Sequence, residues 1–196
     1  MNIKLVTIVL CFVCCALACK KEDKDYFTSS VDLEQLTFLP DSFLCTATKE
    51  VPGLGSIPWT ANCYVYIADN RLELRFRTYQ DTINKGIRER LSCSYVPIKQ
   101  DRFGVGIFDY YAQPVVYNTH AIYSRSLDDG DVVDGLWQID TTQTNYIDIT
   151  ELDLLNKRIS GKFDLYFRMR TQGTHGILYS ERINFKSGNF RARIDE

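Results

Sequence analysis

Hydrophobic and polar residues alternate with a period of two along most of the chain, from about residue 35 to the C-terminus. The clearest example is residues 71–77, in which two leucines and a phenylalanine alternate with charged side chains. Such alternation is typical of an antiparallel strand with one buried and one solvated face. Asp69 and Asn70 precede this segment, and they predict a tight turn that pairs it with residues 61–68 as a hairpin.

Segments of this kind recur at regular intervals, and turn-forming residues separate them. The predicted strands are residues 61–68, 71–77, 87–95, 115–123, 132–140, 146–152, 159–167, 176–185 and 189–194. We find no long window with a helical period and capping residues. The pattern therefore predicts one all-β domain over residues 35–196, as an antiparallel β-sandwich or open barrel of about 9–11 strands.

The N-terminus has a different pattern, because Lys4 is followed by an uncharged apolar run over residues 5–18. This run is shorter than the roughly 20 residues that a helix needs to cross the hydrocarbon of a bilayer. It is typical of a signal-peptide core. A buried N-terminal helix is the alternative, but the run has no amphipathic period and charged residues follow it directly.

The run ends in Ala16, Leu17, Ala18 and Cys19, which resembles a bacterial lipoprotein box. The small Ala18 before the cysteine fits the box, whereas Ala16 and Leu17 stand in exchanged order. The resemblance implies that residues 1–18 are removed and that Cys19 carries acyl chains such as palmitate. Two or three chains anchor a protein stably, because each buried CH₂ contributes about 0.8 kcal/mol. We therefore expect an exported protein anchored in the outer membrane.

Six charged residues follow the cysteine at positions 20–25, within a tether that we assign to residues 19–34. Such a run cannot be buried and forms a solvated spacer. It also resembles the surface-export signals on lipoproteins of Bacteroidota-type bacteria. The first interpretation leaves the domain on the periplasmic face, and the second puts it on the cell surface.

Composition narrows the function classes. Hydrophobic residues make up 45% and charged residues 24%, which is typical of a globular domain. The formal net charge is −2, so no basic excess favours nucleic acid as a partner. The chain has two histidines and contains neither a GxSxG nor an HExxH motif. We therefore expect no catalytic residues and a protein that is not an enzyme.

Three of the seven cysteines lie in the predicted mature domain outside the lipidation site, at Cys45, Cys63 and Cys93. Each lies among apolar residues at strand spacing, which predicts three buried thiols. One disulfide, most simply between Cys45 and Cys63, is the alternative in an oxidising compartment. No two of them form a CxxC motif, so a redox or metal motif is not supported.

An acidic segment is the candidate metal site, with carboxylates at Asp128, Asp129, Asp131 and Asp134. Ca²⁺ takes six to eight oxygen ligands, and acidic loops can supply several of them. The order of residues does not match an EF-hand, and acidic residues also favour β-turns for geometric reasons alone. We therefore expect no cofactor, with Ca²⁺ at this loop as the alternative.

Trp59, Tyr110 and Tyr111 are the candidate ligand-binding residues. Rings of this type, apolar with a polar tip, can stack on sugars or anchor a protein partner. The alternative is packing within the domain, because aromatic residues are enriched in strands. A basic stripe is also predicted on outward strand positions near the C-terminus, at Arg158, Lys162, Arg168, Arg170, Arg191 and Arg193.

Two short motifs carry a resemblance to a family. Residues 147–150 read I-D-I-T, and residues 159–163 read I-S-G-K-F. They resemble the I-x-I-T and I-S-G-x-F strands of small Bacteroidota-type lipoproteins of unknown function. The resemblance implies that the two strands form a hairpin and that a final strand pair follows, here residues 183–190. It brings no catalytic site.

These observations lead to three functional hypotheses. The first is a lipid-anchored envelope lipoprotein that serves as a non-enzymatic interaction or structural component, with an envelope protein as partner. The second is a surface module that binds a carbohydrate or another small ligand. The third and most distant is a hydrolase, which would need carboxylates that converge in a cleft.

Overall fold

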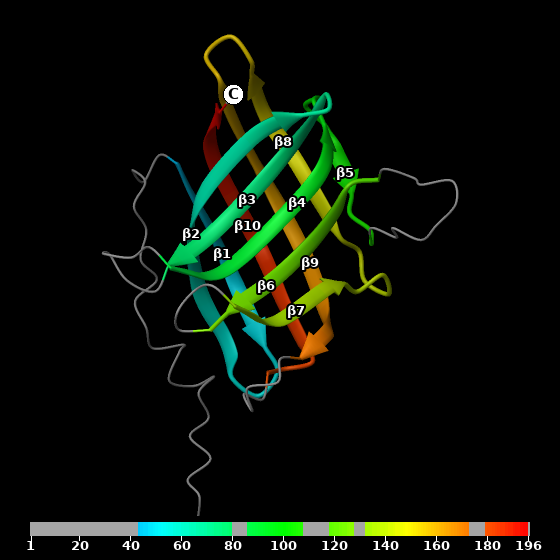
Figure 1. The fold of residues 1–196 in the computed structure, drawn as a ribbon. Helices are drawn as coiled ribbons and strands as arrows, with labels where there is room; N and C mark the ends of the chain where they lie inside the picture. Colours follow the sequence, from blue (N-terminus) through cyan, green and yellow to red (C-terminus); the bar gives the residue numbers. More distant parts are fainter. Residues whose placement is uncertain (1–42, 80–85, 108–117, 128–131, 173–178, 196) are drawn as a thin grey trace, which may run out of the picture.

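The structure is a computed structural model that describes residues 43–79, 86–107, 118–127, 132–172 and 179–195. The described residues form ten strands that belong to one sheet (Figure 1). The strands are β1 (Leu44–Val51), β2 (Gly55–Ala68), β3 (Arg71–Tyr79), β4 (Ile87–Pro97), β5 (Arg102–Gly104), β6 (His120–Ser126), β7 (Val133–Ile139), β8 (Tyr146–Asp153), β9 (Arg158–Gln172) and β10 (Arg182–Asp195). The predicted all-β fold is confirmed.

Eight of these strands close into an antiparallel barrel, in the order β1, β2, β3, β4, β6, β7, β9, β10. β1 completes the ring, because it pairs antiparallel with both β2 and β10. The sheet is therefore a closed barrel, whereas the sequence pattern left a sandwich or an open barrel as the two choices. Closure removes the exposed sheet edges that an open arrangement would leave.

The two remaining strands lie outside the ring. β9 pairs with β8 along its first half and with β7 along its second half, so β8 and β7 lie one after the other along the same side of β9. β5 pairs with β8, and Gly106 just after β5 forms a bridge to His120 at the start of β6. The segment after β5 therefore connects β8 to the beginning of β6.

Two expected hairpins are present, β2–β3 from the turn residues and β8–β9 from the motif resemblance, and local sequence explains their turns. Asp69 and Asn70 have φ values of 50° and 55°, so the β2–β3 turn has positive φ at both central residues, as a type I′ turn requires. The β8–β9 hairpin ends in a turn whose last residue, Lys157, has a φ of 54°. Leu155 at the tip of that turn is 91% exposed.

The strands of the C-terminal segment differ from the prediction. Residues 182–195 form the single strand β10 instead of two strands separated by a turn. The predicted turn is a bulge, with a register shift between Phe185 and Gly188 and a φ of 52° at Ser187. A bulge lets the strand bend without ending, so β10 pairs with β9 on both sides of the irregularity.

Side chains fill the barrel interior. Its middle is apolar, and the Phe76 ring lies 5.4 Å from the Phe163 ring and 5.6 Å from the Phe190 ring. Eight strands enclose a space just wide enough to be filled by side chains or to hold one small ligand, and here the rings occupy it. The largest fully buried residues are Trp59, Trp137, Tyr123, Phe76, Phe163, Phe167, Phe185, Leu72, Leu74, Leu91, Ile139 and Ile147.

The three cysteines of the domain are buried free thiols. Burial raises the pKa of the Cys93 thiol to about 12, so it is uncharged at neutral pH. Burial also raises the pKa values of Cys45 and Cys63 well above the usual range. The structure therefore agrees with the interpretation of these residues as small hydrophobic side chains.

The predicted signal peptide (residues 1–18) and tether (residues 19–34) lie outside the described residues. In the part of the chain that the structure describes, there is no helix with the length and hydropathy to cross a membrane. The six residues of the predicted basic stripe are all exposed on β9 and β10, as the pattern indicated.

Gly161 provides a test of the packing between β8, β9 and β10. A Cβ atom at this position would lie 2.4 Å from the Asp148 carbonyl oxygen and 2.6 Å from the Phe190 ring. We expect Gly161→Ala to lower the free energy of unfolding by about 1–3 kcal/mol, because the surrounding backbone has to move. Urea denaturation would measure this change. Gly104→Ala is the matched control, since no atom lies within 4 Å of its added Cβ; equal losses in both variants would contradict the packing argument.

Candidate functional site

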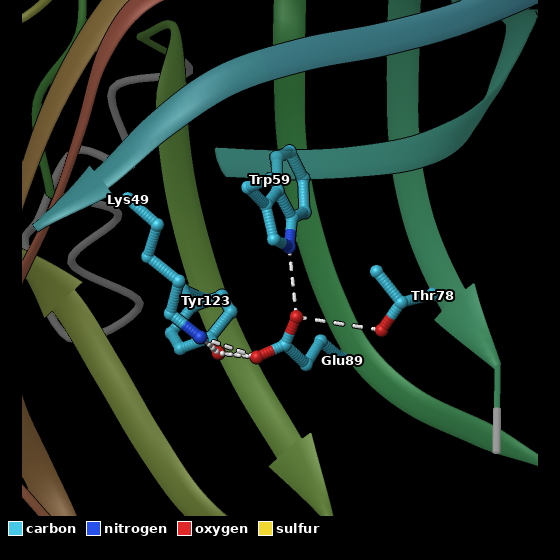
Figure 2. Close-up of polar contacts among 5 residues, drawn as sticks. All are labelled: Lys49, Trp59, Thr78, Glu89 and Tyr123. Atoms are coloured by element: carbon cyan, nitrogen blue, oxygen red, sulfur yellow. Dashed lines mark hydrogen bonds and ion pairs between the residues drawn. The ribbon is translucent and has the colours of Figure 1, made fainter. Parts of the chain in front are cut away.

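A cluster of polar side chains lies inside the barrel, towards one end. Five strands contribute one residue each: β1, β2, β3, β4 and β6 (Figure 2). The residues are Lys49, Trp59, Thr78, Glu89 and Tyr123. Glu89 is 7% exposed and Lys49 is 6% exposed. Both occupy inward positions of their strands, where the alternation otherwise places apolar side chains.

Glu89 is the centre of the cluster, and its carboxylate accepts hydrogen bonds from four residues. Oε1 forms an ion pair with Lys49 Nζ and accepts a hydrogen bond from Tyr123 Oη at 2.7 Å. Oε2 accepts hydrogen bonds from Trp59 Nε1 at 2.7 Å and from Thr78 Oγ1 at 3.4 Å. Lys49 Nζ also donates to Tyr123 Oη at 3.0 Å. Both oxygens of the buried carboxylate therefore have partners.

The electrostatic environment keeps Glu89 ionised. Burial raises the pKa of this carboxyl. The positive charges of Lys49 and Arg125 and the hydrogen bonds from Lys49 and Tyr123 lower it by a larger amount, so that the pKa is about 2. Burial and the neighbouring Glu89 raise the pKa of Tyr123 well above its usual value. Tyr123 therefore keeps its proton, in agreement with its role as a hydrogen-bond donor to Glu89.

A second polar group adjoins the first. The Tyr179 hydroxyl donates to Asp134 Oδ2 at 2.9 Å, and the Arg125 guanidinium lies 5.5 Å from the centre of the Tyr179 ring. Trp137 connects the two groups, because its ring lies 5.5 Å from Tyr179 and 5.1 Å from Tyr123. The two groups therefore contain two buried basic residues, Lys49 and Arg125, and two buried acidic residues, Glu89 and Asp134.

This arrangement favours a structural role over a catalytic one. A general acid or base works best when its pKa lies near the operating pH, and a carboxyl with a pKa of about 2 is far from that condition. Within the described ranges, no group of three or more histidine, cysteine, aspartate or glutamate side chains could hold a metal ion. The cluster connects five strands through one carboxylate.

Two of the residues predicted as site residues are described, and both are buried. Trp59 is 1% exposed and donates to Glu89, so its ring packs inside the barrel, which is the alternative that the sequence left open. Asp134 is 2% exposed and accepts the hydrogen bond from Tyr179. The other predicted residues lie outside the described ranges: Cys19, Tyr110, Tyr111, Asp128, Asp129 and Asp131.

Sequence reasoning did not single out Lys49 or Glu89. The sequence does contain a signal for both, because each is a charged residue at a position of its strand where the alternation calls for an apolar one. Because buried charges have to be paired, two such exceptions in one chain indicate an internal ion pair. The separation of 40 residues between them gives no local indication that they meet.

Replacement of Glu89 tests the cluster. We expect Glu89→Gln to lower the free energy of unfolding by about 3–5 kcal/mol, because it leaves the Lys49 ammonium buried without its counter-ion. The double variant Lys49→Met with Glu89→Gln removes both charges and should recover part of the loss. Urea denaturation of the two variants measures the difference. A double variant less stable than Glu89→Gln alone would contradict the ion-pair argument.

Acid unfolding provides a second test of Glu89. Its pKa is about 2 in the folded chain and its usual value is 4.5, so the unfolded state binds the proton first as the pH falls. The stabilisation is complete above pH 4.5 and is lost as the pH falls towards 2, by about 3 kcal/mol. In Glu89→Gln this part of the pH dependence should disappear. If the free energy of unfolding depended on pH equally in the unmodified protein and in Glu89→Gln over this range, the assignment would be contradicted.

Comparison of the chain with known protein families, curated proteins and solved structures gave no match.

Proposed function

We propose that this protein is a lipid-anchored component of the outer membrane that acts through binding and has no catalytic activity. The observation that carries the proposal is the N-terminal sequence, an apolar run that ends in Ala18 and Cys19 and continues into charged residues. Acyl chains on Cys19 would hold the domain at the membrane, and the tether of residues 19–34 would separate it from the surface. The partner would be an envelope protein.

The closed barrel supports a role in interaction. Aromatic side chains fill the middle of the interior, and the buried carboxylate of Glu89 accepts hydrogen bonds from four residues. A partner would therefore meet the rims and the outer face of the described barrel. Rigid barrels suit this task, because the strands fix the positions of the loops that carry binding residues.

The resemblance of the β8–β9 segment to small Bacteroidota-type lipoproteins agrees with this proposal. The I-D-I-T and I-S-G-K-F motifs lie opposite each other as an antiparallel hairpin, with Ile147 across from Phe163 and Ile149 across from Gly161. These residues serve folding, since Ile147, Ile149 and Phe163 are buried. They assign no chemistry to the protein.

A carbohydrate-binding module is the second candidate function. The buried position of Trp59 does not favour the ring platform expected from the sequence, and Tyr110 and Tyr111 lie outside the described residues. What favours this candidate is a groove at the other end of the barrel, which is lined by different residues. No described carboxylate side chain lines that groove, so it does not support a hydrolase.

Substitution of Cys19 tests the anchor. We expect Cys19→Ala to abolish incorporation of labelled palmitate and to move the protein from the detergent phase to the aqueous phase in a phase-partition assay, because the acyl chains are lost. Cys14→Ala is the matched control and should leave both readouts unchanged. Unchanged labelling in Cys19→Ala would refute the assignment. For the anchored protein, protease treatment of intact cells would show whether the domain lies on the cell surface or on the periplasmic face of the membrane.

A further inference from the structure

A groove of about 730 Å³ lies at the barrel end opposite the Glu89 cluster. Glu89 and Tyr95 lie on the same strand, β4, and their separation along it corresponds to about 20 Å. The residues that line the groove come from the start of β3, the end of β4, β5 and the segment after it, the two residues before β6 and the β7–β8 turn. Strand ends from distant parts of the sequence therefore build one concave surface.

Tyr95 occupies an unusual backbone conformation in the wall of this groove. Its φ of 59° lies in the left-handed region, which bulky residues rarely adopt. The β3–β4 register shifts at this point, with Leu72 opposite Val96 and Leu74 opposite Cys93. Between these two pairs β4 has one residue more than β3, which makes a β-bulge. Bulges reorient side chains and are frequent near functional sites.

Several polar contacts hold the bulge in place. The Glu73 carboxylate accepts a hydrogen bond from the Tyr95 amide at 3.1 Å and another from Ser94 Oγ at 2.6 Å. Thr119 Oγ1 donates to the Tyr95 carbonyl at 3.2 Å. Strained backbone persists only where its surroundings enforce it, and such positions concentrate at sites that clamp ligands. The conformation of Tyr95 is therefore supported from β3 and from the residue that precedes β6.

The Tyr95 ring and its neighbours provide an aromatic wall. The ring is half-buried, and its centre lies 5.5 Å from that of His120, whose Nδ1 is 3.0 Å from the Asn118 carbonyl oxygen. Phe103 on β5 is also half-buried and lines the same groove. Aromatic faces offer flat apolar surface that suits the C–H faces of sugar rings.

Two arginines, Arg71 and Arg102, line the groove. Arg102 lies 4.3 Å above the Tyr146 ring, and its Nη2 forms an ion pair with Asp148 at 3.1 Å. A guanidinium has five N–H donors, so this ion pair engages only part of the Arg102 side chain. Arg71 is exposed and forms no ion pair within the described part of the chain. Among the described lining residues there are two arginines and no carboxylate side chain.

Amide and hydroxyl groups complete the surface. Asn118, Gln143 and Thr144 are exposed in the groove and offer donors and acceptors of the kind that bind sugar hydroxyls. Asn145 fixes the turn that carries two of them, because it donates to the Asp140 carbonyl at 2.9 Å and its Oδ1 accepts a hydrogen bond from the Tyr166 amide at 2.7 Å. The polar groups are thus held in position before a ligand binds.

We propose that this groove binds an acidic oligosaccharide, with Arg71 and Arg102 at its carboxylate or sulfate groups and Tyr95 against a sugar ring. Arginine forks match the geometry of planar oxyanions, which favours an acidic over a neutral sugar. The site is distinct from the Glu89 cluster and from the lipid anchor. The proposal rests on the second candidate function and gives it a specific ligand class. It does not depend on the lipid anchor.

The test measures binding of the full-length chain, purified in a non-ionic detergent, to three hexasaccharides by calorimetry. They are an oligogalacturonate, a chondroitin sulfate fragment and neutral maltohexaose. We expect at least one acidic probe to bind, maltohexaose to bind at least tenfold more weakly, and affinity to fall as NaCl is raised. Arg102→Ala should weaken binding of the acidic probe by about tenfold or more. Arg170→Ala is the matched control, because it removes an exposed arginine from the opposite end of the barrel.

Tyr95→Gly separates binding from folding. Glycine adopts positive φ without strain, so this variant removes the ring and keeps the backbone conformation. We expect this variant to bind the acidic probe about tenfold more weakly. Its thermal unfolding midpoint should stay within a few degrees of that of the unmodified protein.

Five results would overturn the proposal, and the first four concern the oligosaccharides. They are the absence of binding to either acidic probe, equal affinity for maltohexaose, wild-type affinity in both Arg102→Ala and Tyr95→Gly, and an equal loss in Arg170→Ala. Inorganic sulfate that binds as tightly as the oligosaccharides would also refute it, because it would indicate a simple anion site.

Discussion

The ionised carboxylate of Glu89 inside the barrel is the constraint on which the rest of the structure depends. A charge removed from water has to be compensated by partners, and Glu89 receives them from β1, β2, β3 and β6. Each partner reaches the carboxylate only if its strand is in the observed register, because a shift of one residue would turn the side chain outward. The cluster therefore couples closure of the barrel to the pairing of one buried charge.

The barrel is divided along its axis into parts with different physical character. The polar cluster lies towards one end, packed phenylalanine rings and thiols fill the middle, and the groove with two arginines lies at the other end. Because the middle is filled, recognition and internal structure are separated in space. The buried charges stabilise a register, while the groove stays available to a ligand.

The groove also shows how the barrel departs from regular pairing to create a site. The bulge at Tyr95 interrupts the β3–β4 ladder, and β7 ends where β8 begins along β9, which leaves room for the segment after β5. Hydrogen bonds from Gly106 to Thr119 at 2.9 Å and from Val105 to Asn145 at 3.1 Å hold that segment. The irregular positions are therefore as well fixed as the strands, as binding surfaces require.

Local chemistry alone determined most of the strands and the β2–β3 turn, because a period of two and residues such as Asp69 and Asn70 act on their immediate neighbours. It also indicated buried cysteines. β1 and β5 were not among the predicted strands, and the β8–β9 hairpin was expected from the motif resemblance. Only the tertiary structure decided the closure of the barrel by β1 between β2 and β10, the burial of Trp59, the continuity of β10 through its bulge and the meeting of Lys49 with Glu89 across 40 residues. These features depend on pairing between distant strands, and the free energy that selects such pairing comes from packing and charge compensation inside the closed barrel, which no short segment carries.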